Sequence, residues 1–126
     1  MGQLDGKVAL VTGAGDGIGA GIARVFAAEG ARVVVAEINP DTGRAVADSL
    51  GDAGHFVACD VADKSQVESA VTAAVDYFGT LDVLVNNAWG GGRISRVEQK
   101  TPELVQGGLD IGFLGPLWAM NAAHAV

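Results

Sequence analysis

The strongest constraint on this chain lies near its start, where an apolar run, a glycine cluster and a helix-forming segment follow one another. The apolar run covers residues 8–11, and residues 20–28 carry the helical pattern. The cluster between them contains Gly13, Gly15, Gly17 and Gly19. This order predicts a strand, a tight turn and a helix. Glycine lets backbone approach a ligand closely, and a helix N-terminus attracts anions, so we expect an anion site that suits a dinucleotide pyrophosphate.

A glycine-rich turn can also be purely structural, so its spacing and its surroundings decide between the two interpretations. Ile18 stands five residues after Gly13, which breaks the pattern G-x-G-x-x-G, whereas Thr12, Gly13, Gly17 and Gly19 fit T-G-x-x-x-G-x-G. No Lys-Ser or Lys-Thr pair directly follows the glycine cluster, as a P-loop would require. Nucleotide hydrolysis is therefore not expected.

Strand-like apolar runs recur along the chain and alternate with helix-like segments. The runs cover residues 8–11, 32–36, 55–59 and 82–85. They are nearly continuous in Val, Leu and Ala, which is typical of parallel strands buried on both faces. The pattern predicts an α/β fold, a doubly wound parallel sheet with helices on both faces.

Helix signals separate the predicted strands. We expect helices over residues 17–28, 40–50 and 63–78, the first two with ordinary start and stop residues. Thr101-Pro102-Glu103 is a strong start for a last helical region. The chain stops inside an apolar helical pattern, which favours a longer protein.

Composition limits the remaining classes. A chain of 126 residues predicts one domain, residues 1–126, and a net charge of −7 argues against nucleic acid as a partner. The single cysteine and the absence of a Cys or His cluster in the sequence predict no disulfide and no metal. No apolar stretch suits a signal segment or a membrane span, so we expect a cytoplasmic protein.

Two acidic residues follow predicted strands. Glu37 stands 24 residues after Gly13, near where a dinucleotide fold places a carboxylate for ribose hydroxyls, and the alternative is a solvated loop acid. Asp60 follows the third strand, where Asp60 or Asp63 could instead cap the next helix.

Taken in order, Thr12-Gly13, Glu37, Asp60-Val61 and Asn86-Asn87-Ala88 resemble motifs of the short-chain dehydrogenase/reductase family. The resemblance implies a Rossmann-type sheet with strand order 3-2-1-4, incomplete at its C-terminal side, and a nicotinamide cofactor. Asp60 would then accept the adenine amine. The cofactor-binding residues that it implies are Gly13, Gly15, Asp16, Gly17, Ile18, Gly19, Glu37, Asp60, Val61, Asn87 and Ala88.

The chain departs from the family pattern at several positions. Trp89 stands where the family has glycine, and Gly112 stands where it has a proton-relay asparagine. Family enzymes use a Tyr four residues before a Lys, but Leu81 follows the only tyrosine, Tyr77, at that distance. We therefore expect no catalytic residue in this chain. It is then either the NAD-binding part of an oxidoreductase for alcohol or carbonyl substrates, or a noncatalytic dinucleotide-binding module.

Two further expectations concern ligand choice and assembly. Glu37 and Asp16 place negative charge where the 2′-phosphate of NADP would lie, which predicts a preference for NAD. The fourth strand would end the sheet with a free edge, and the last helix would expose an apolar stripe, so we expect self-association.

Overall fold

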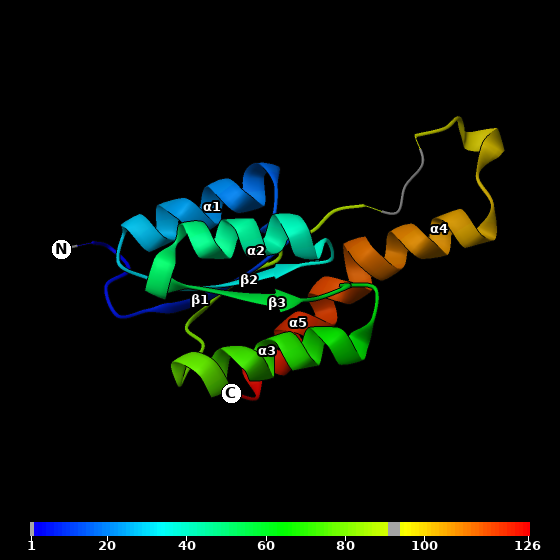
Figure 1. Ribbon diagram of the computed structural model, residues 1–126. Helices are drawn as coiled ribbons and strands as arrows, with labels where there is room; N and C mark the ends of the chain where they lie inside the picture. The colour runs from blue at the N-terminus through cyan, green and yellow to red at the C-terminus, as the bar shows by residue number, and fades with distance from the viewer. Residues whose placement is uncertain (1, 91–93) are drawn as a thin grey trace.

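The structure, a computed structural model that describes residues 2–90 and 94–126, has one four-stranded parallel sheet between two helical layers. Numbered along the chain, the strands lie side by side in the order 3-2-1-4, as predicted. Helices α1 (Gly17–Ala28) and α2 (Pro40–Ser49) cover one face of the sheet, and α3 (Lys64–Phe78) and α5 (Gly115–His124) cover the other (Figure 1). This is a Rossmann-type arrangement.

The four strands lie close to their predicted positions. They are β1 (Val8–Thr12), β2 (Arg32–Glu37), β3 (Gly54–Ala58) and β4 (Val83–Val85). Leu10 at the centre of β1 is opposite Val34 of β2 and Leu84 of β4. Strand β3 begins and ends one residue earlier than predicted, because its register with β2 runs out at the pair Glu37 and Ala58.

Burial separates the central strands from the edge strands. Every residue of β1 is buried, and so are residues 33–36 of β2. Strands β3 and β4 are only partly buried, so the prediction of full burial on both faces is wrong for them. The reason is position, since β3 and β4 are the two edges of the sheet.

Alternate residues of the central strands enter two separate cores. Val11, Val33 and Val35 pack with alanines of α1 and with Val46 and Ala47 of α2. Leu10, Val34 and Ala36 point to the opposite face and pack against α3 and α5. This alternation is the two-residue period of a β-strand, so both faces of one short strand contribute to the fold.

The described residues form five α-helices. They are α1 (Gly17–Ala28), α2 (Pro40–Ser49), α3 (Lys64–Phe78), α4 (Pro102–Leu109) and α5 (Gly115–His124). Two short 3₁₀ turns cover Gly51–Ala53 and Val97–Gln99. Asn39, Asp63 and Thr101 accept hydrogen bonds from the first turns of α2, α3 and α4. These polar caps explain why the starts of the helices are readable in the sequence.

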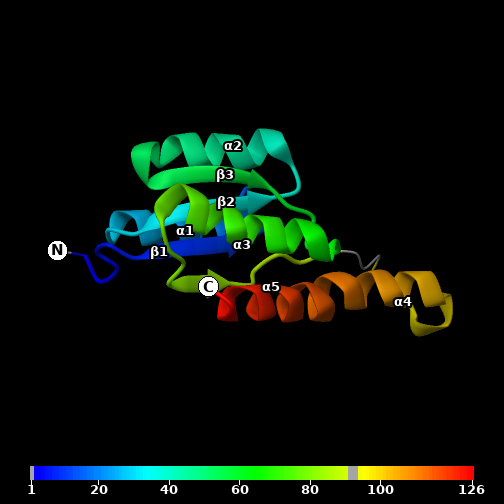
Figure 2. The same cartoon turned by 90° about the horizontal axis from the view of Figure 1, so that it is seen from below.

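A π-helical segment, Asp110–Leu114, joins α4 to α5. The three segments form one continuous rod that runs along the lower side of the sheet, and α4 extends beyond the strand ends (Figure 2). The sequence predicted a helical region here but gave no sign of the π-helical turn. Gly112 lies in the middle of that turn.

Across 2–90 and 94–126, no helix combines the length and the apolar character needed to cross a membrane. Among the same residues, no group of three or more His, Cys, Asp or Glu side chains is arranged to hold a metal ion.

Candidate functional site

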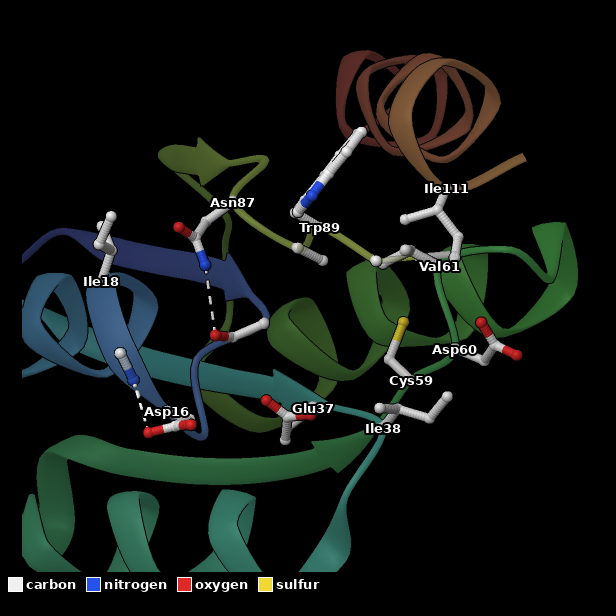
Figure 3. Close-up of a pocket in the computed structure, with 14 residues that line it drawn as sticks. Asp16, Ile18, Glu37, Ile38, Cys59, Asp60, Val61, Asn87, Trp89 and Ile111 are labelled. Carbon is white, nitrogen blue, oxygen red and sulfur yellow. Dashed lines mark hydrogen bonds between the residues drawn. The ribbon is translucent and has the colours of Figure 1, made fainter. Parts of the chain in front are cut away.

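A cavity of about 570 Å³ opens at the carboxyl ends of the strands (Figure 3). It lies where the chain order of the sheet reverses between β1 and β4, the usual ligand position in open α/β sheets. Its volume falls in the range of small-molecule and cofactor sites. The lining residues are Gly13, Asp16, Gly17, Ile18, Glu37, Ile38, Cys59, Asp60, Val61, Asn87, Ala88, Trp89, Gly90 and Ile111.

The turn between β1 and α1 requires glycine at two positions, Gly13 and Gly19. Gly13 has φ of 64°, and a Cβ added to it would lie 2.8 Å from the Ala88 Cα. A Cβ at Gly19 would lie 2.5 Å from the Asn87 Nδ2 and would overlap the Gly13 carbonyl oxygen. The glycines therefore let the turn pack directly against the segment after β4.

The N-terminal end of α1 faces the cavity. The Asp16 carboxylate accepts a hydrogen bond of 2.8 Å from the Gly17 backbone N–H, which caps the helix. The Ile18 side chain is 79% exposed and lines the cavity. A helix start of this kind, preceded by a glycine turn, is a natural anion site.

The Glu37 carboxylate is held in place by backbone at the end of β2. Its Oε1 accepts a hydrogen bond of 3.0 Å from the Gly15 N–H, and its Oε2 accepts one of 3.1 Å from the Asn39 N–H. A Cβ at Gly15 would lie 2.5 Å from the Glu37 Cγ. Gly15 therefore positions Glu37 rather than lining the cavity, and a carboxylate has lone pairs left for a ligand.

The structure separates the two acids that follow β3. Asp63 is the N-cap of α3 and accepts from the backbone of Ser65 and Gln66. Hydrogen bonds from the Ser65 hydroxyl and the Gln66 N–H lower the pKa of Asp63. Asp60 instead lines the cavity, with its Oδ1 accepting a hydrogen bond of 2.9 Å from the Ala62 N–H. Asp63, and not Asp60, is therefore the residue that caps α3.

Thr12 ties the ends of β1 and β4 together. Its hydroxyl accepts hydrogen bonds from the backbone N–H groups of Asn87 (3.1 Å) and Ala88 (3.0 Å) and donates to the Val85 carbonyl (3.4 Å). The Asn87 side-chain amide donates in return to the carbonyls of Thr12 (3.0 Å) and Gly13 (3.2 Å). The Thr12 residue is 3% exposed, so these bonds are shielded from water.

Nine of the eleven predicted site residues line the cavity, and Gly15 and Gly19 lie behind its wall. Sequence reasoning missed Ile38, Cys59, Trp89, Gly90 and Ile111 as lining residues. Ile38 and Cys59 adjoin predicted strand-end acids, so their position alone would have indicated them. Ile111 gives no comparable signal, since it comes from the distant rod of α4 and α5.

Cys59 lines the cavity but is buried, with 4% of the residue exposed. Burial, followed by the negative charges of Asp60 and Asp63, raises the pKa of its thiol from 9.0 to about 11. The thiol is therefore protonated at neutral pH and is a poor nucleophile.

The fold and the place of the cavity define a Rossmann-type domain, and comparison with known proteins gives the family. The family model described as short chain dehydrogenase matches residues 7–125. The chain belongs to the short-chain dehydrogenase family of oxidoreductases.

Individual relatives agree with the family match. Galactitol 2-dehydrogenase of Agrobacterium fabrum is 40% identical, over 98% of this chain and 48% of that protein. Momilactone A synthase of Oryza sativa subsp. japonica is 44% identical, over 98% of this chain and 45% of that protein. The chain therefore spans about half the length of these curated relatives.

A solved structure extends the comparison to three dimensions. It is the crystal structure of 3-ketoacyl-(acyl-carrier-protein) reductase from Brucella melitensis complexed with NADH. The TM-score is 0.90 and the identity 39%, over 94% of this chain and 49% of that one.

The Thr12 hydroxyl generates a first prediction. Thr12→Val keeps the shape but leaves the Asn87 and Ala88 N–H groups without their acceptor, and should lower the free energy of unfolding by about 2–4 kcal/mol. Thr12→Ser keeps the hydroxyl and should cost about 1 kcal/mol for the lost methyl group. Urea unfolding measures both, with Thr72→Val on the exposed face of α3 as the control. Equal losses for Val and Ser would contradict this role.

Cys59 generates a second prediction. Two pKa units correspond to about a hundredfold less thiolate, and burial also limits access of the reagent, so iodoacetamide at pH 8 should alkylate the folded chain at least about a hundredfold more slowly than the urea-unfolded chain. Mass spectrometry follows the reaction at this single cysteine, and free glutathione in each buffer corrects for the effect of urea. Equal rates before and after unfolding would refute the raised pKa.

Proposed function

We propose that the cavity binds a nicotinamide dinucleotide, with NAD preferred to NADP, and that the chain is the cofactor-binding part of a short-chain dehydrogenase/reductase oxidoreductase. The observation that carries the proposal is that the glycine turn before α1 and the Glu37 carboxylate line the same cavity. The NADH complex of the Brucella melitensis reductase, a structural neighbour, supports it.

The residues present suit the parts of such a ligand. The start of α1, with Gly13 and Gly17 on the cavity wall, suits the pyrophosphate, and Glu37 suits the ribose hydroxyls. Asp60 and Val61 suit the adenine, with the Asp60 carboxylate accepting from its amine. When bound, the nicotinamide ring supplies the hydride donor or acceptor.

Asp16, Ile18, Asn87 and Ala88 complete the proposed contacts. Ile18 provides apolar surface beside the start of α1, and the backbone of Asn87 and Ala88 borders the opposite wall. Gly15 and Gly19 act indirectly in this proposal, through the positions of Glu37 and Asn87.

The preference for NAD rests on charge. A 2′-phosphate on the ribose would lie beside the Glu37 carboxylate, and a like-charge pair at ~5 Å and an effective dielectric constant of ~20 costs about 3 kcal/mol. Two arginines near these elements are engaged elsewhere: the Arg44 guanidinium lies 5.3 Å from the Phe56 ring centroid and that of Arg32 lies 6.0 Å from the Phe78 centroid. Neither arginine lines the cavity to offset the repulsion.

Calorimetry on the soluble chain should therefore give a dissociation constant for NAD that is roughly ten- to a thousandfold lower than for NADP. Glu37→Ala should narrow the ratio from both sides, because NADP binding loses the repulsion and NAD binding loses the hydrogen bond between the carboxylate and the ribose. Asp52→Asn, in the 3₁₀ turn that precedes β3 at the other end of the sheet, is a charge-matched control and should leave both constants unchanged. Equal or tighter NADP binding by the unmodified chain would overturn the role of Glu37.

Turnover is proposed to require residues outside this chain. Tyr77 stacks on His55 with ring centroids 3.8 Å apart, away from the cavity lining, and Leu81 stands four residues later. In a longer protein the substrate would be an alcohol or carbonyl compound. The alternative, a noncatalytic dinucleotide-binding module, predicts a stop codon after Val126, whereas an open reading frame with Tyr-x-x-x-Lys further on supports the enzyme.

We also propose that the chain self-associates through the rod of α4 and α5. Val105, Leu109, Phe113 and Leu117 recur every fourth residue along the rod and are all exposed. Met120 extends this exposed apolar set toward the end of α5. Strand β4 adds an edge of the sheet on the same side of the molecule (Figure 2). Exposed apolar stripes and free strand edges both favour contacts between chains.

Light scattering at tens of micromolar should show dimers or larger species. Phe113→Lys should shift the distribution toward monomer, because it places charge inside the stripe. Val25→Lys, on exposed apolar surface of α1, is the matched control and should change nothing. A monodisperse monomer of the unmodified chain at this concentration would refute the proposal.

A further inference from the structure

Trp89 presents an aromatic ring to the cavity with little to cover it. The residue is 80% exposed, yet it lines the cavity together with Val61 and Ile111 (Figure 3). Burying an indole on folding is favourable, and this one remains largely uncovered. A flat apolar surface left open on a cavity wall is suited to a flat ligand.

Gly112 lets the indole occupy this position. A Cβ added to Gly112 would lie 3.0 Å from the Trp89 Cζ3 and 3.7 Å from its Cε3. The six-membered ring of the indole therefore rests against the backbone of the π-helical turn. A larger side chain at residue 112 would compete with the ring for the same space, so the two residues form a complementary pair.

The cavity wall has two chemical sides. Trp89, Val61 and Ile111 gather on one side, with the Asp60 carboxylate near Val61, whereas the carboxylates of Glu37 and Asp16 lie on the other (Figure 3). A dinucleotide combines charged phosphates, sugar hydroxyls and two flat heteroaromatic rings. The start of α1 suits the phosphates and the carboxylates suit the sugar hydroxyls. The side of the cavity that carries Trp89 is therefore left for one of the rings.

We propose that the Trp89 indole, supported by Gly112, is a stacking platform for a heteroaromatic ring of the bound dinucleotide. This inference rests on the proposed function, because it needs the cavity to take a dinucleotide. Stacking of a base on an aromatic side chain changes affinity by about five- to more than a hundredfold when the side chain is truncated.

Calorimetry with NAD tests the platform. Trp89→Ala should raise the dissociation constant about tenfold or more, whereas Trp89→Phe, which keeps a ring, should stay within about threefold. AMP and nicotinamide mononucleotide serve as separate probes: loss of AMP affinity assigns the adenine to Trp89, and loss of mononucleotide affinity assigns the nicotinamide. Either loss supports the platform, and loss of neither overturns it.

Fluorescence gives an independent readout. The chain has two tryptophans, and Trp118 packs against the core beneath the sheet. In a Trp118→Phe background the remaining emission comes from Trp89, and it should be quenched by NAD with the dissociation constant found by calorimetry. Unchanged emission at saturating NAD would contradict stacking.

A double-mutant cycle tests the support from Gly112. Gly112→Leu should weaken NAD binding in the unmodified chain but have little further effect in the Trp89→Ala background, because its effect acts through the indole. Gly108→Leu in α4, where an added Cβ meets nothing within 4 Å, is the matched control. Equal effects of Gly112→Leu in both backgrounds would overturn the pairing.

The outcomes also separate the two proposals. If the unmodified chain fails to bind NAD, the proposed function fails and the platform falls with it. If the unmodified chain binds NAD and Trp89→Ala binds it equally well, the platform alone is overturned and the proposed function stands.

Discussion

The close approach of the β1 turn to the segment after β4 is the constraint on which the site depends. The buried Thr12 hydroxyl accepts hydrogen bonds from two backbone N–H groups of this segment, and the Asn87 side-chain amide donates a hydrogen bond to the Thr12 carbonyl. Gly13 and Gly19 permit this contact, because a Cβ at Gly13 would collide with the Ala88 backbone and a Cβ at Gly19 would collide with the Asn87 side chain. The carboxyl ends of the two strands are thereby held together under one wall of the cavity.

A missing side chain, at Gly15, also determines the position of the Glu37 carboxylate on the other wall of the cavity. Gly15 lets the Glu37 side chain pack against the turn, and its N–H fixes one carboxylate oxygen while the Asn39 N–H fixes the other. A carboxylate oriented by two backbone donors keeps its place without any ligand, so the entropy of ordering it is not lost on binding. The turn before α1 thus positions groups on both sides of the cavity.

Much of this arrangement was predictable, since the relevant signals are local. Apolar runs and helix-start signals such as Asp63 and Thr101-Pro102-Glu103 indicated the strands and helices to within a residue or two. The family resemblance implied Glu37, Asp60 and Asn87 as cofactor-binding residues, and all three line one cavity because parallel pairing brings the carboxyl ends of the strands to one edge. The division of roles between Asp60 and Asp63 needed the structure, because both acids precede the same helix.

The contributions from the rod of α4 and α5 were not predictable. Ile111 lines the cavity from a π-helical turn, and no local residue preference predicts such a turn. Trp89 and Gly112 each looked like an isolated departure from the family pattern. Only the structure shows that the indole occupies space which Gly112 leaves open.

Hydrogen exchange of the soluble chain with and without saturating NADH tests most directly whether the cavity takes a dinucleotide. The account predicts slower exchange in residues 13–19, 37–39, 59–61 and 87–90, the segments that contain the lining residues and their immediate neighbours, and unchanged exchange on the outer face of α3 around Ser69 and Thr72. Protection confined to other surfaces, or no protection at all, would contradict the account.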